Sequence, residues 1–105
     1  MAKYAFIYRG GRPPGSPEEG QAHMSAWRAW AASLGEAYVY PGMPFSNAVT
    51  VSATGTSEGS GDIPLAGVSV VEAESLDAAR EMAATCPHLT LGGDIVVAEG
   101  MDLEM

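Results

Sequence analysis

The chain has 105 residues, with 13 acidic against 5 basic side chains, which suits one small domain spanning residues 1–105 and leaves no room for two. A net charge of −8 without any basic cluster argues against a nucleic-acid partner. No apolar run approaches the roughly 18 residues of a membrane span, and the single cysteine, Cys86, cannot form an internal disulfide, so we expect a cytoplasmic protein with no membrane partner.

The first third of the chain predicts a strand followed by a helix. Residues 3–9 are almost continuously aromatic or apolar and stop at a glycine pair, which is typical of a strand. Ser16-Pro17-Glu18-Glu19 is a capping box with proline at the first helical position, so we expect a helix from Pro17 to Leu34 that ends at Gly35. Helical spacing joins five residues into its buried stripe: His23, Trp27, Trp30, Ala31 and Leu34.

The middle of the chain predicts two short strands and a loop. Residues 36–40 and 47–53 have strand character, and the prolines at 41 and 44 between them disfavour regular pairing. Residues 54–62 are rich in glycine, serine and threonine without periodicity, which indicates an exposed loop.

The last third repeats the strand, helix, strand pattern. Residues 65–73 and 94–99 read as strands because of their valine and isoleucine content. Ser75 is a helix cap, and Pro87 ends the helix that follows. The stripe of this second helix comprises Leu76, Ala79, Ala83 and Cys86.

This order predicts an α+β fold, a ferredoxin-like βαββαβ sandwich with one extra short strand and both helices on one face of an antiparallel sheet. The first and last strands are apolar on both of their faces, which is typical of a sheet covered on both sides. A second copy of the chain is the simplest cover, so we expect a homodimer with room for a small-molecule ligand between its paired sheets.

Much of the chain resembles the YCII-related proteins. The resemblance is carried by residues 67–86 (GVSVVEAESLDAAREMAATC), by the Pro87-His88-Leu89 continuation, and by residues 92–97. The N-terminal strand, the tryptophan-bearing helix that ends in Ser-Leu-Gly-Glu, and the Pro-Gly-Met-Pro-Phe turn match as well. The chain lacks the Asp-Gly-Pro-Phe motif of one large branch, and Gly61-Asp62-Ile63-Pro64 stands near its place.

The resemblance implies the dimeric α+β barrel fold. It also implies acid-base chemistry by a histidine of the first helix, with an acidic partner, and His23 is the matching position. A histidine exchanges protons near neutral pH, which suits this role. The two acidic residues that suit the partner's place are Glu36, just after the helix, and Asp94, at the start of the last strand.

Five further residues are candidates for ligand binding. Arg9 lies between the first strand and the first helix, where it is placed to bind an anionic group, as is Arg12. Tyr8, Tyr40 and Trp27 are candidates to line the ligand space, although core packing explains aromatic residues equally well.

We expect no cofactor and no metal. The glycines near residues 10–15 do not follow the dinucleotide fingerprint. Cys86 and His88 flank a proline and are too few for zinc.

Two functions remain open on the sequence. One is a cofactor-independent enzyme of acid-base type, an isomerase, lyase or small monooxygenase, with His23 as acid or base. The other is a non-catalytic dimeric assembly module that contacts partners through its acidic half, because residues 58–105 carry ten acidic groups and one basic group.

Overall fold

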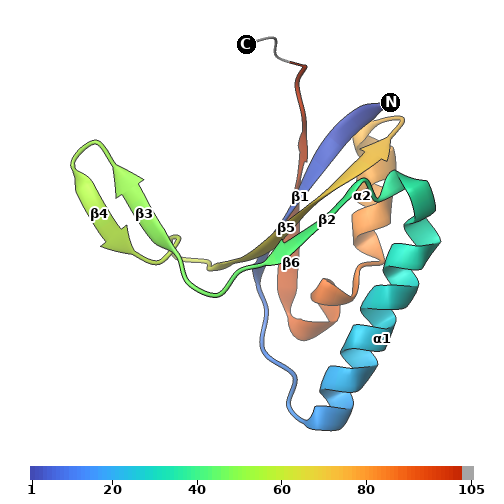
Figure 1. Cartoon of the computed structure of the whole chain (residues 1–105), viewed down its shortest axis with the longest axis horizontal. Helices are drawn as coiled ribbons and strands as arrows, with labels where there is room; N and C mark the ends of the chain where they lie inside the picture. Colours follow the sequence, from blue (N-terminus) through green and yellow to red (C-terminus); the bar gives the residue numbers. More distant parts are fainter. Residues whose placement is uncertain (103–105) are drawn as a thin grey trace.

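The computed structural model describes residues 1–102 (Figure 1). Its strands are β1 (Ala2–Gly10), β2 (Tyr40–Pro44), β3 (Val49–Ser52), β4 (Gly55–Glu58), β5 (Leu65–Ala73) and β6 (Gly93–Glu99). Its helices are α1 (Pro17–Leu34) and α2 (Leu76–Ala84), with 3₁₀ turns η1 (Gly35–Ala37) and η2 (Pro87–Leu91). Within this part of the chain, neither helix has the length and hydrophobicity needed to cross a bilayer.

Four strands form one antiparallel sheet in the order β2-β5-β1-β6. Both helices lie on the same side of this sheet (Figure 1). The α+β class, the antiparallel sheet and the one-sided helix layer are therefore confirmed. The strand order agrees with a ferredoxin-like arrangement, in which the two β-strands that flank each helix are not neighbours in the sheet.

Helix α1 begins and ends where its capping residues predict. The Glu19 backbone amide donates to Ser16 Oγ at 3.1 Å, as in a capping box. The Glu19 carboxylate accepts from the amide of Gly15 at 2.7 Å, one residue earlier than the reciprocal bond of that motif. Gly35 takes a positive φ of 57° at the other end, a conformation that glycine adopts without strain.

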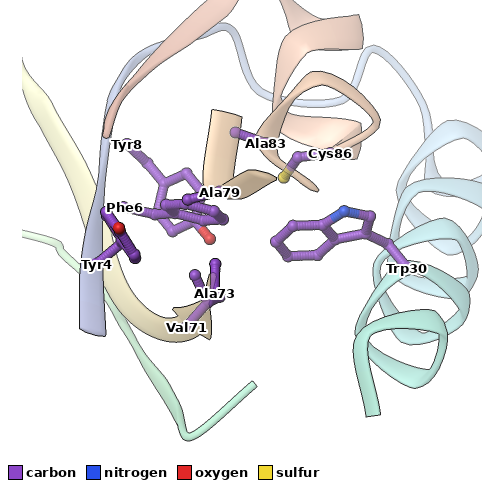
Figure 2. Packing of buried hydrophobic residues seen from close by; sticks show 9 residues of the cluster. All are labelled: Tyr4, Phe6, Tyr8, Trp30, Val71, Ala73, Ala79, Ala83 and Cys86. Atoms are coloured by element: carbon purple, nitrogen blue, oxygen red, sulfur yellow. The ribbon is translucent and has the colours of Figure 1, made fainter. Parts of the chain in front are cut away.

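The core lies between the sheet and the two helices (Figure 2). Trp30 reaches from α1 toward the sheet, where its ring stacks on Phe6 at a centroid distance of 6.3 Å. Its indole Nε1 donates to the Met82 carbonyl at 3.1 Å, which ties α1 to α2. In the predicted stripe of α2, Ala79, Ala83 and Cys86 are buried, whereas Leu76, the first residue of the helix, is 48% exposed.

The segment after α1 differs from the prediction. Residues 35–37 form a 3₁₀ turn, and the strand comes later, at residues 40–44, inside the segment predicted as a loop. Proline is tolerated there because β2 is an edge strand. Gly42 has a φ of 80°, and a Cβ at this position would lie 1.6 Å from the Val68 carbonyl oxygen, so only glycine permits this approach to β5.

The extra strand, β3, is one strand of a hairpin and does not join the main sheet. β3 pairs only with β4, with Val49 opposite Glu58 and Val51 opposite Thr56, and β4 occupies part of the segment predicted as a loop. The hairpin extends away from the helices and from the body of the molecule (Figure 1). We call residues 49–58 the arm. Val49 and Val51, on one of its faces, are 59% and 74% exposed.

The face of the sheet opposite the helices is apolar, and no described element covers it. Strand register aligns Ile7 with Val68 on one side and with Val96 on the other. We call this surface the outer face; it comprises Ala5, Ile7, Val68, Val70, Val96 and Ala98. Val96 is 41% exposed, so this surface meets solvent in the single chain.

Candidate functional site

A partly enclosed cavity with titratable side chains in its wall lies on the helix-covered side of the sheet, next to the β2–β5 edge. It has a volume of about 360 Å³, within the range of small-molecule sites. Helix α1 contributes His23, Met24 and Trp27, while Tyr8, Gly67 and His88 come from the sheet and from η2. The Met43–Pro44 end of β2 completes the wall. The ligand space predicted from the sequence was on the opposite side, between paired sheets.

His23 lines this cavity and is half-buried. The indole Nε1 of Trp27, one helical turn later, donates to His23 Nε2 at 2.8 Å. An indole nitrogen only donates, so Nε2 carries the lone pair and the ring proton of the neutral imidazole is on Nδ1. The predicted stripe therefore places His23 at the cavity, and its neighbour fixes which nitrogen holds the proton.

His88 is a second histidine at the same cavity, and the sequence analysis assigned it no role there. It is buried, and its Nε2 donates to the Arg9 carbonyl oxygen at 2.9 Å, since a carbonyl only accepts. A Cβ on Gly93 would lie 2.1 Å from Nε2, so the ring packs directly on the start of β6. No sequence pattern predicts this contact, because it depends on how η2 packs against β1 and β6.

Tyr8 packs against both Trp27 and His88. Its ring packs edge-on against Trp27 at 5.4 Å and against His88 at 5.5 Å between centroids. Its hydroxyl is hydrogen-bonded to Ser69 Oγ at 2.5 Å, and burial raises the pKa of the phenol, so Tyr8 stays protonated at neutral pH. Tyr8 and Trp27 line this cavity on the helix side of the sheet, whereas the ligand space in which they were expected lay between paired sheets.

Arg9 and Asp94 form an ion pair with each other. The guanidinium donates to both carboxylate oxygens at 2.8 and 2.9 Å, and this pairing lowers the pKa of Asp94. Side chains alternate along a strand, so Arg9 and Asp94 lie on the face opposite Tyr8. Tyr40 aligns with Val70 of the outer face and is 42% exposed, away from the cavity as well.

The acidic residue nearest to His23 along α1 is Glu19, not Glu36. Glu36 follows the helix, and at 1.5 Å per residue the distance from His23 to the helix end is about 17 Å. Glu19 precedes His23 by one turn, so i,i+4 spacing was the signal that pointed to it. Its carboxylate accepts from Arg12 Nη1 at 2.7 Å, and this bond together with the Gly15 amide lowers the pKa of Glu19.

A larger and more open groove runs between α1 and η2, with a volume of about 810 Å³. Arg12 and Glu19 are its charged lining residues, and they form an ion pair with each other. Because this groove is open and its charges are mutually satisfied, the smaller cavity with two histidines and a tyrosine is the better candidate site.

The described residues offer neither a metal site nor a reactive thiol. Across residues 1–102, no three histidine, cysteine, aspartate or glutamate side chains gather closely enough to hold a metal ion. Cys86 is buried, and burial raises the pKa of its thiol to about 11, which disfavours the nucleophilic thiolate.

No protein-family model matches the chain, and a search of curated proteins finds no match. The resemblance to YCII-related proteins therefore stays a prediction.

Proposed function

We propose that this protein binds a small, largely apolar molecule in the cavity formed by Tyr8, His23, Trp27 and His88, and that the two histidines carry out acid-base chemistry on it without a cofactor. His88 keeps one ring nitrogen free to accept a proton, and His23 presents an N–H that can polarise a ligand oxygen. The observation that supports this best is the cavity itself, about 360 Å³ in volume, in which two histidines with fixed hydrogen bonds stand among aromatic and aliphatic side chains. An isomerisation suits such a site best, because moving a proton from one atom of the substrate to another needs only acid-base groups; a lyase reaction would in addition have to release a leaving group.

The test is to block the cavity from its exposed rim. Met24 is 52% exposed and lines the cavity, so Met24→Trp fills the entrance without disturbing the core. The matched control is Ala32→Trp, at an exposed position of the same helix that does not line the cavity. We expect M24W to abolish the chemical-shift changes that small aromatic fragments cause at Tyr8 and Trp27, and A32W to leave them unchanged. Equal fragment binding by both variants would contradict the proposal.

We further propose that the functional unit is a homodimer whose outer faces pack together. A folded monomer of 10.9 kDa exposes about 5,600 Å². This chain exposes 7189 Å². The chain therefore exposes more surface than expected, and this additional area exceeds the roughly 800 Å² that each partner contributes to a standard interface. The outer face and the arm both expose apolar side chains, which a second copy of the chain would cover.

The same surfaces support a second candidate function, a non-catalytic assembly module. Its supporting observation is the arm, which carries exposed Val49 and Val51 away from the body of the molecule. The fragment experiment separates the two functions, because an assembly module needs no ligand in the cavity.

A further inference from the structure

We propose that the cavity selects neutral molecules that carry both an oxygen acceptor and a hydroxyl donor, because His23 and His88 offer it opposite hydrogen-bonding atoms. This inference rests on the proposed ligand-binding function and specifies the chemical class of the ligand. Hydroxylated aromatic ketones and enols of similar size belong to this class.

His23 is the donor of the pair. Its Nε2 is occupied by the Trp27 indole N–H, so the neutral ring presents Nδ1–H. His23 Nδ1 has no hydrogen-bond partner among residues 1–102. Within the same residues, every fully buried side-chain nitrogen or oxygen does have a hydrogen-bond partner, so Nδ1 is not fully buried. The Nδ1 atom therefore has access to open space. His23 borders this cavity and also the more open surface on either side of α1, and we assign the Nδ1–H to the cavity. Trp27 is in this sense a positioning residue, because its N–H determines the tautomer of His23.

His88 is the acceptor. Its Nε2 proton is committed to the Arg9 carbonyl, so the neutral ring carries its lone pair on Nδ1. Within the described part of the chain, His88 Nδ1 has no hydrogen-bond partner. It is also not among the fully buried atoms that lack one, so it must be accessible to solvent or to a ligand. The candidate cavity is the open space that His88 lines. The ring cannot swing away freely, because Gly93 packs against it.

The remaining wall excludes charged ligands. The described residues that line the cavity include no lysine, arginine, aspartate or glutamate. Arg9, the cation expected to hold an anionic group, is paired with Asp94 on the other face. A carboxylate or phosphate would lose its hydration there without a fixed counter-charge. A neutral ligand with one acceptor and one donor satisfies both histidines.

The test compares fragments of one shape by calorimetry and NMR. The probes are 3- and 4-hydroxyacetophenone, with ethylbenzene as the apolar control and 3-hydroxybenzoate as the anionic control. Since a net hydrogen bond contributes about 1 kcal/mol, two of them predict that the better hydroxyacetophenone binds at least tenfold more tightly than ethylbenzene. The benzoate should bind more weakly than either hydroxyacetophenone.

Three variants test which residues make the two proposed hydrogen bonds to the ligand, one with His23 and one with His88. His23→Leu and Trp27→Phe should each weaken hydroxyacetophenone binding about fivefold relative to ethylbenzene binding; because both residues line the cavity, the ratio of the two affinities is the readout. His88→Phe should do the same; because it alters a buried residue, ring ¹⁵N shifts of the wild-type protein provide an independent readout. These shifts should show His23 protonated at Nδ1 and His88 at Nε2, and the His23 preference should be lost in W27F.

The outcomes separate this inference from the function on which it rests. If ethylbenzene and the hydroxyacetophenones bind equally and M24W blocks all of them, the cavity is a ligand site and the donor-acceptor inference is overturned. Identical tautomers at the two histidines would also overturn it. If no probe binds, or if M24W leaves binding intact, the proposed function fails and the inference fails with it.

Discussion

At the scale of single residues, the site depends on hydrogen bonds that fix two imidazole rings. Spacing along α1 was enough to place His23 and Trp27 on one stripe, because helical periodicity is a local property of the sequence. The role of His88 was not predictable in this way. Its position depends on the Arg9 carbonyl and on Gly93, which lie far from it in sequence or belong to another element.

Gly93→Ala should displace His88. The added Cβ would lie 2.1 Å from the imidazole Nε2, closer than any real contact, so either the ring or the start of β6 must move. We expect a loss of about 1–3 kcal/mol of unfolding free energy, measured by urea denaturation, together with weaker fragment binding. Gly20→Ala is the control: its Cβ would meet Pro14 at an ordinary 3.7 Å, and helix propensity predicts a gain of about 0.5–1 kcal/mol. A G93A variant as stable as the wild type would show that the ring is not confined.

At the scale of elements, the sequence predicted both helices and the three long strands, and failed in the middle of the chain. Helix α1 has a serine cap, a proline at N1 and a terminal glycine, and β1, β5 and β6 are rich in β-branched or aromatic residues. β2 contains two prolines and a glycine, and β4 is Gly-Thr-Ser-Glu, so neither has strand propensity. They form strands because of a partner, β5 for the first and β3 for the second.

The arm should contribute to dimerisation and not to the fold of the single chain. A two-stranded hairpin is marginally stable alone in water, so we expect Val49 and Val51 to pack against the second copy. The Gly59 amide donates to the Ala48 carbonyl at 2.9 Å, so residues 49–58 can be replaced by a two-residue turn without moving the main sheet.

We expect this deletion to keep the circular dichroism of the sheet and helices and to weaken dimerisation at least tenfold by analytical ultracentrifugation. A V49S/V51S variant, which keeps the hairpin and removes its apolar face, should have a similar effect. Unchanged dimer affinity in both variants would exclude the arm from the interface.

At the scale of the whole molecule, the single chain is more extended than its length requires. Its radius of gyration is 15.0 Å, against about 13 Å for a compact domain of this size. The helices protect one face of the sheet, while the outer face and the arm remain exposed. The buried core includes three alanines and few large aliphatic side chains, so we expect the outer face to supply further apolar burial when two copies meet.

Dissociation should therefore lower the stability of the fold. Val96→Lys places a charge on the outer face at a position already 41% exposed, so the single chain can accommodate it while a paired face cannot. Leu76→Lys is the matched control, since Leu76 is 48% exposed on α2, on the helix side. We expect V96K to sediment as a monomer with a lowered Tm, and L76K to remain a dimer. The Tm of the wild type should fall on dilution, because dilution favours the monomer and association stabilises the fold by mass action. A wild-type protein that sediments as a monomer with a Tm independent of concentration would rule out the dimer and with it the assembly function.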